Sequence, residues 1–327
     1  MNTLLGPTEE QVDRIHARLQ QSIAHGPARK HQPSNRRHVT VRRAGYIAVV
    51  AGALAAGLVI TGAIAPQGPG HGDTAQAAEL LQNAATATIK TSDPIVGPGQ
   101  YLRIATNSAY MSQIFHPTGP DTYYLYPTTG TLYIPADRSQ QWVWERHNLP
   151  ITTVFGTPAQ KAEVKLGPQP PDPNTDGIFR ANAGAFYGTP AQDDHLAAQP
   201  RDAQALLAYF QQKATGKGPS ENSEIWTLIT DELRTGVVPA DLRAALYKTA
   251  ALIPGIAVIG TDVTLDGKTG EAIGLMNGNV RDDIIIDPTT GMMIGERTVA
   301  LKAGFGIPAG TSVAWTSIST TVAKTAP

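Results

Sequence analysis

The chain has 327 residues, with 26 Lys and Arg against 27 Asp and Glu, which gives a formal net charge of -1 at pH 7. This balance excludes a strongly basic protein that binds nucleic acid. The sequence has no Cys, which excludes disulfides, a lipid-modified cysteine, thiol catalysis and a cysteine-ligated metal.

An uncharged run of 22 residues, Ala44–Ala65, predicts a transmembrane helix. As a helix the run would be about 33 Å long, enough to cross a hydrocarbon core of about 30 Å. Six of the 15 residues before it are basic, and the next Lys or Arg after it is Lys90. This asymmetry places the N-terminus in the cytoplasm, where anionic lipid would lie near Arg36, Arg37, Arg42 and Arg43. A cleaved signal peptide ending at the Ala63-x-Ala65 pattern is the alternative, disfavoured by the long preceding segment and by Pro66.

The predicted span divides the chain into four parts. These are a cytoplasmic tail at 1–43 with a formal charge of +5, a transmembrane helix at 44–65, a linker at 66–73 and an extracytoplasmic domain at 74–327. In the tail, Thr8 and Gln11 have the spacing of a capping box, and a stripe of apolar residues follows it. A short amphipathic helix is expected there. Its partner could be the inner membrane surface, a second copy or a cytoplasmic protein, and the alternative is a frayed tail that binds nothing.

The outer domain opens with an expected Ala-rich helix over Thr74–Ile89. Short segments rich in aromatic and β-branched residues then predict strands, at Gln100–Ser108, Thr122–Tyr126, Thr131–Ile134, Gln140–Arg146 and Ile151–Phe155. The stretch 174–198 has no clear pattern. Apolar stripes at helical spacing predict three helices, at Asp202–Ala214, Ser223–Thr235 and Pro239–Leu252.

Five more strands are expected at the C-terminal end, separated by turn sequences such as Asp266-Gly267 and Asn277-Gly278. They are Ile256–Thr264, Glu271–Met276, Val280–Ile286, Met292–Ala300 and Thr311–Val322. Because strand groups flank a helical group without alternating βα units, we expect an α+β domain. Its sheet should be curved and largely antiparallel, half-barrel-like, and packed with helices.

Four segments of the chain resemble an uncharacterised actinobacterial family of single-span membrane proteins. They are Leu206–Tyr209, Pro239–Tyr247, Ile253–Ile256 and Ile286–Gly291, and the similarity extends from about Leu5 to Thr298. The Leu-Pro pair typical of the family before the first segment is Gln199-Pro200 here. The resemblance implies no activity. The exported part is also similar in element order to the half-barrel of periplasmic lipoprotein carriers and of regulators that act on anti-sigma factors, an analogy of fold that transfers no residues.

The candidates for catalysis or metal binding are weak in this sequence. Asp193-Asp194-His195 could ligate a divalent metal, but a solvated loop is the favoured interpretation. Asp282, Asp283 and Asp287 lack the spacing of a calcium loop and are expected to be solvent-facing charges beside a turn. No nucleophile elbow or zinc-binding helix motif occurs. We therefore predict no catalytic residue, no cofactor and no metal, and a protein that is not an enzyme.

Two aromatic pairs are the remaining candidates for a site. Trp142 and Trp144 are two residues apart on a predicted strand and so share a face, as do Tyr124 and Tyr126 on another. Core packing is the favoured role of these rings. The functional alternative is that they line an apolar pocket for a lipid, an acyl chain or a peptide.

The sequence thus favours a membrane-anchored envelope protein. Its outer domain would bind a ligand or partner, and its cytoplasmic helix could report that binding to a cytoplasmic protein. A membrane-tethered carrier or chaperone for lipids or lipoproteins is the alternative. An envelope hydrolase is the third class, disfavoured because no nucleophile or metal constellation is found.

Overall fold

The computed structural model describes residues 71–116, 118–170, 172–189 and 191–327. The expected cytoplasmic helix, basic segment and transmembrane helix lie outside the described residues. Among the helices that are described, none combines the length and the apolar character that a membrane crossing requires.

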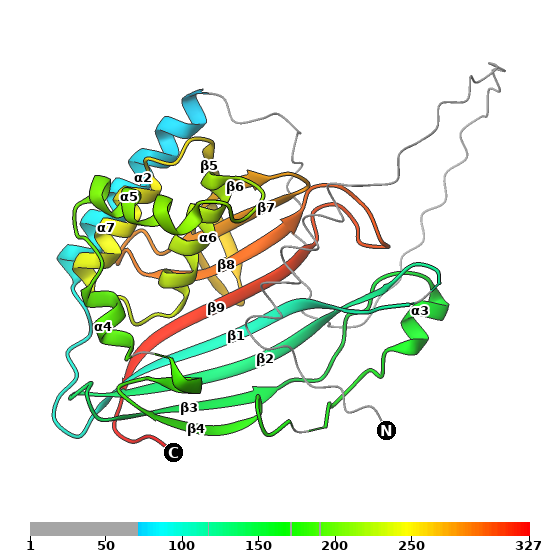
Figure 1. Ribbon diagram of the computed structural model, residues 1–327, viewed down its shortest axis with the longest axis horizontal. Coiled ribbons are helices and arrows are strands. Elements are labelled where there is room, and N and C mark those ends of the chain that lie inside the picture. The colour runs from blue at the N-terminus through cyan, green and yellow to red at the C-terminus, as the bar shows by residue number, and fades with distance from the viewer. Residues whose placement is uncertain (1–70, 117, 171, 190) are drawn as a thin grey trace.

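The described chain forms an α+β fold built on one antiparallel sheet of nine strands (Figure 1). The first group of strands is β1 (Tyr101–Ile114), β2 (Thr122–Pro135), β3 (Gln141–Asn148) and β4 (Gly177–Asn182). The second group is β5 (Ile256–Leu265), β6 (Lys268–Asn277), β7 (Val280–Ile286), β8 (Met293–Ala300) and β9 (Ser312–Ala323). Their order is β4-β3-β2-β1-β9-β8-β7-β6-β5, so the sheet is open, with β4 and β5 at its edges.

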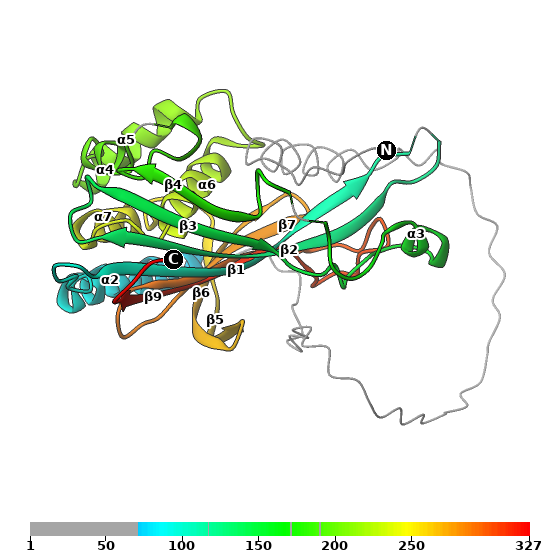
Figure 2. The same ribbon diagram turned by 90° about the horizontal axis from the view of Figure 1, so that it is seen from below.

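Four helices form a layer on one face of the sheet (Figure 1). They are α2 (His71–Thr91), α5 (Ala203–Ala214), α6 (Glu221–Arg234) and α7 (Ala240–Ala250). Helix α2 packs on α7 and β5, while α5 and α6 pack on α7 and on each other. Two short helices, α3 (Pro158–Glu163) and α4 (Gln192–Ala197), lie outside this layer, with α3 at the far end of the long β1–β2 pair (Figures 1 and 2).

Local signals at the helix starts agree with the predicted helices. Asp202 caps α5 by accepting hydrogen bonds from the backbone N–H groups of Gln204 and Ala205, and Ser220 caps α6 in a capping box with Ser223. Pro239 precedes the first turn of α7. All three helices are therefore confirmed to within about three residues at each end.

The C-terminal strands form the expected meander, in which each strand pairs with the next. The N-terminal strands differ more from prediction. The two segments expected at Thr122–Tyr126 and Thr131–Ile134 are one continuous strand, because residues 127–130 stay paired with β1. Gly130 allows this, since a Cβ there would crowd the side chains of Thr106 and Trp144. Residues 151–155 form only isolated bridges, and β4 and α4 lie in the stretch without a pattern.

The main core fills the space between the helix layer and the sheet. Its fully buried members come from both sides and include Leu81, Ile104, Trp142, Trp226 and Tyr247. Two smaller apolar clusters lie on the other face of the sheet, one around Tyr123 and Phe155 and one around Ile285. The sheet therefore has a large core on its helix-covered face and only local cores on its back face.

Gly291 is a position at which the core depends on glycine. It has a φ of +66°, and a Cβ there would collide with the backbone of α2 at Ala84 and Thr88. Its carbonyl accepts a hydrogen bond of 2.9 Å from the buried hydroxyl of Tyr247. The turn after β7 can therefore approach α2 and α7 only without a side chain.

We expect Gly291→Ala to lower the free energy of unfolding by at least about 2 kcal/mol more than Gly278→Ala does. Gly278 is the matched control, because its φ is +64° but a Cβ there would touch nothing within 4 Å. Urea unfolding followed by tryptophan fluorescence measures both. Equal losses would mean that the turn can move away from α2.

Candidate functional site

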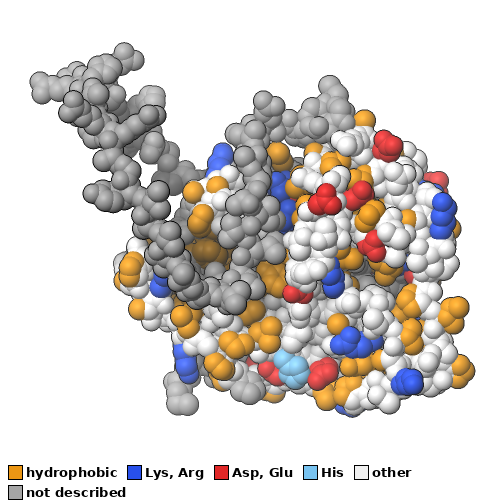
Figure 3. All heavy atoms as spheres, turned by 180° about the vertical axis from the view of Figure 1, so that it is seen from behind, with side chains coloured by type: hydrophobic (Ala, Val, Ile, Leu, Met, Phe, Trp, Pro, Cys, Tyr) orange, Lys and Arg blue, Asp and Glu red, His pale blue; other side chains and the backbone are white. Residues whose placement is uncertain are grey.

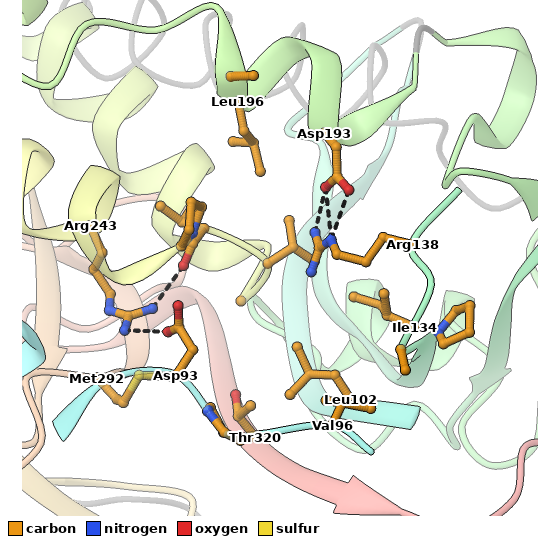
Figure 4. Close-up of a pocket in the computed structure, with 18 of the residues that line it drawn as sticks. Asp93, Val96, Leu102, Ile134, Arg138, Asp193, Leu196, Arg243, Met292 and Thr320 are labelled. Atoms are coloured by element: carbon orange, nitrogen blue, oxygen red, sulfur yellow. Dashed lines mark hydrogen bonds and ion pairs between the residues drawn. The ribbon is translucent and has the colours of Figure 1, made fainter. Parts of the chain in front are cut away.

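A cavity of about 490 Å³ opens where the helix layer meets the end of β1 and β2 (Figure 4). Its apolar walls come from six segments of the chain. They are formed by Val96 after α2, Leu102 and Ile134 on the sheet, Leu196 of α4, and Val237 and Met292 from loops. The cavity thus lies at the junction of the two layers and is partly open to solvent.

Arg243 of α7 forms one side of the cavity through a network of four hydrogen bonds. Its Nη1 donates to the carbonyl of Val238 at 2.8 Å, and its Nε donates to the hydroxyl of Thr88 at 2.5 Å. Its Nη2 donates to Asp93 at 2.8 Å, and the second oxygen of Asp93 accepts from the backbone N–H of Ala240 at 2.8 Å. Asp93 therefore also caps α7, whose own preceding residue, Pro239, has no side-chain cap. This network holds α2, the linker after it and α7 together.

Arg138 approaches the cavity from the opposite side, from the turn after β2 (Figure 4). Its Nε and Nη2 donate to the carboxylate of Asp193 on α4, at 2.6 to 2.9 Å. Its guanidinium also lies over the ring of Trp142, 5.0 Å from the centroid, a favourable cation–π geometry. The indole Nε1–H of Trp142 donates to the carbonyl of Arg138 at 2.8 Å. The buried tryptophan thus positions both the backbone and the side chain of Arg138.

Arg201, the third arginine of the lining, is held mainly by main-chain oxygens. Its Nη1 donates to the carbonyls of Leu196 and Gln199 at 2.9 and 2.7 Å, and its Nε donates to Asp241 at 2.8 Å. Burial acts to raise the pKa of Asp241, but the hydrogen bonds from Arg201 and from the backbone of Leu242 lower it below the usual value. The aspartate is thus ionised at neutral pH.

The lining of the cavity contains three arginines, at 138, 201 and 243, and each is paired with an aspartate. Asp93 and Asp193 also line the cavity, whereas Asp241 lies outside the lining. The arginine side chains are 32%, 35% and 5% exposed, whereas Asp193, Asp241 and Asp93 are 44%, 58% and 42% exposed. In each pair the cation is the more buried partner. The cavity therefore combines apolar walls with fixed guanidinium groups.

None of the four aromatic residues considered from the sequence lines this cavity. Trp142 is 1% exposed and belongs to the main core. Trp144 packs edge-on against Phe186 and carries the guanidinium of Arg146 over its ring. Tyr124 and Tyr126 share one face of β2 and are half-buried. The structure thus separates the two pairs, and only Trp142 touches the cavity indirectly, through Arg138.

The Asp193-Asp194-His195 triplet is helical and not the loop that was expected, since it forms the centre of α4. Its side chains diverge. Asp193 pairs with Arg138, whereas His195 contacts Glu232 of α6 at 2.6 Å. Within the described residues, no group of three or more His, Cys, Asp or Glu is placed to hold a metal ion.

The expectation of solvent-facing charges at Asp282 and Asp283 is wrong. The side chain of Asp283 is fully buried on the back face of the sheet, where it accepts hydrogen bonds from Arg281 at 2.6 Å and from Arg297 at 2.8 Å. Both arginine side chains are 3% exposed. Gly274 makes room on the neighbouring strand, since a Cβ there would overlap Asp283. The sequence signal for this cluster is the Arg281-x-Asp283 spacing, which puts an arginine and an aspartate on the same face of a strand.

Asp282 points to the helix-covered face of the same strand. Burial raises its pKa to about 6, and the nearby charges of Asp283 and Glu296 act in the same direction, against a hydrogen bond from Thr298. Asp287 does lie beside its turn, where it accepts from the N–H of Thr289 and the hydroxyl of Thr290.

Comparisons with known proteins give little further information. No family model matches the chain, and no curated protein matches it. Among solved structures, a LolA superfamily protein from Nitrosomonas europaea is similar over 77% of this chain and 94% of the other chain. The sequence identity is 6% and the TM-score is 0.16. Similarity at that level supports no argument about this chain. The resemblance to the actinobacterial single-span family gains no support from these comparisons and stays a prediction.

We expect Asp283→Asn to lower the free energy of unfolding by about 3 to 5 kcal/mol, because it leaves two buried guanidinium groups without a counter-charge. Asp262→Asn, an exposed position on β5, should change it by less than about 0.5 kcal/mol. Denaturant unfolding compares the two variants. A loss below about 1 kcal/mol for Asp283→Asn would show that Arg281 and Arg297 can stay buried without a counter-charge.

Asp282 should make stability depend on pH in a defined direction. Its pKa in the folded protein, about 6, exceeds the ordinary value of 3.8, so the folded state binds the proton more tightly. Between these two values, the stability that Asp282 contributes decreases as pH rises. We therefore expect the slope of melting temperature against pH over this range to be more positive for Asp282→Asn than for the natural protein. An unchanged slope would contradict this assignment.

Proposed function

We propose that the protein is a non-enzymatic, membrane-anchored envelope protein that binds a ligand with an apolar chain. Ala44–Ala65 would span the membrane with the N-terminus in the cytoplasm, and the domain at 74–327 would lie outside. The helix layer and the sheet beneath it would act as a half-barrel-like fold around the ligand. The observation that carries this proposal is the cavity between the two layers, with its apolar walls and its arginines.

The size and chemistry of the cavity support ligand binding. Its volume of about 490 Å³ falls within the range of about 300 to 1,000 Å³ that is usual for small-molecule sites. Such sites are mostly apolar, with a few fixed polar groups that orient the ligand. Here the walls are apolar and the polar groups are ion-paired arginines held by backbone carbonyls and by Trp142. The cavity is thus suited to one flexible apolar chain with a polar end.

The same lining supports a binding role over a hydrolytic one. Its described residues offer a base or nucleophile only in Asp93, Asp193 and Thr320, and both aspartates are paired with arginines. A hydrolase would need a general base or nucleophile free to react. Binding without chemistry is therefore the function that this arrangement favours.

A tethered carrier of lipids or lipoproteins is the second candidate, because an apolar cavity would serve transport as well as sensing. The two differ in the step after binding. A sensor would pass the event through the predicted span to a partner of the cytoplasmic tail, whereas a carrier would release its ligand to an acceptor.

We expect the purified protein to carry copurified lipid and Thr320→Trp to lose it, because the indole would occupy the cavity that Thr320 lines. Ile178→Trp is the control. It introduces the same indole at a position on edge strand β4 that is 46% exposed and does not line the cavity. Native mass spectrometry after detergent release measures the bound lipid. Equal occupancy in the two variants, or no bound lipid in the natural protein, would contradict ligand binding in this cavity.

A further inference from the structure

We infer that the ligand is a single-chain amphiphile with an anionic head, a carboxylate or a phosphate monoester, and that its head binds Arg138 in place of Asp193. This inference rests on the proposed function and specifies its ligand. In the unliganded structure, the carboxylate of Asp193 would then occupy the position of the head group.

Arg138 is held in place without its aspartate. The ring of Trp142 lies under the guanidinium, and its indole N–H fixes the carbonyl of the same residue. Trp142 is itself 1% exposed. A guanidinium that is positioned before the ligand arrives loses little conformational freedom on binding.

The ion pair with Arg138, by contrast, holds Asp193 only weakly. Its side chain is 44% exposed, and ion pairs at such exposure contribute about 1 kcal/mol or less. An incoming carboxylate or phosphate would reproduce the same bidentate hydrogen bonds to Nε and Nη2, while Asp193 would turn to water. Helix α4 would stay attached, because Leu196 is buried and His195 contacts Glu232. The exchange therefore replaces one set of charge-assisted bonds by an equivalent set.

The other two arginines of the lining are less suitable for this role. Arg243 is 5% exposed, and its guanidinium is bonded to Thr88, Val238 and Asp93. Arg201 donates through Nη1 to the carbonyls of Leu196 and Gln199 and through Nε to Asp241, so a ligand would have to replace main-chain hydrogen bonds as well as an ion pair. In the described part of the chain, no hydrogen bond uses the Nη1 of Arg138, so this residue also keeps a donor for a third oxygen. Arg138 is thus the best anion donor in the cavity.

The apolar walls lie beside Arg138, so one ligand can pack its chain on the walls and bind the guanidinium with its head. Arg138, Ile134 and Leu196 all line the same cavity (Figure 4). A chain packed on these walls would carry its head to the guanidinium.

The test uses the full chain in nanodiscs, with empty nanodiscs subtracted, and three probes of equal chain length: palmitate, hexadecyl phosphate and hexadecanol. Arg138→Gln should weaken binding of both anions about tenfold or more and change hexadecanol by less than about twofold. Asp193→Asn should strengthen binding of both anions several-fold, since the competing charge is removed. Arg180→Gln, on edge strand β4, is the control and should change nothing.

The outcomes separate this inference from the proposed function. If all three probes bind but Arg138→Gln affects them equally, or if Asp193→Asn weakens the anions, the anionic head is refuted and an apolar-ligand site remains. If no probe binds, both proposals fail. Inorganic phosphate should not displace hexadecyl phosphate at equal concentration; if it does, the site binds free anions and the amphiphile is refuted.

Discussion

The guanidinium of Arg243 is the interaction on which the helix layer depends. Its three nitrogens reach helix α2 and the linker directly after it, at Thr88 and Asp93, and the loop before α7, at Val238. A buried guanidinium is costly unless each donor has an acceptor, so these three segments can pack only in this arrangement. The cavity is a consequence, because the same linker and loop line it.

A second group of buried charged side chains lies in the C-terminal strands. Asp283 with its two arginines occupies the back face of β7 and β8, and Asp282 occupies the opposite face one residue away. On the face shown in Figure 3, acidic and basic side chains are interspersed. The buried polar cluster lies inside an otherwise largely apolar meander, which makes the register of β7 and β8 specific.

The parts of the fold that were predictable are those with local signals. The three central helices have apolar stripes and caps, and the C-terminal hairpins have turn residues such as Asp266-Gly267 with positive φ at both positions. The errors occur where tertiary pairing decides. Residues 127–130 read as a break but stay in β2 because β1 pairs with them, and β4 is a short edge strand without a strong pattern.

The candidate site was not predictable for a related reason. Its arginines lie at 138, 201 and 243 and form no motif, since each is positioned by different local contacts. Trp142 was singled out for its strand position, but its role in holding Arg138 depends on a hydrogen bond from its indole back to the β2–β3 turn. Sequence patterns report which face a residue occupies. They do not report which distant side chain meets it there.

The pairing of β1 with β9 at the centre of the sheet has a consequence for how the molecule reaches its native state. Tyr101 lies opposite Ala323, so the partners are 323 − 101 = 222 residues apart. The two halves of the sheet share this one seam. The N-terminal strands therefore gain their partner at the centre of the sheet only after β9 has been made, although the helices can already pack on them through the main core. Contacts of such large sequence separation are slow to form, and until then one edge of β1 has no strand beside it.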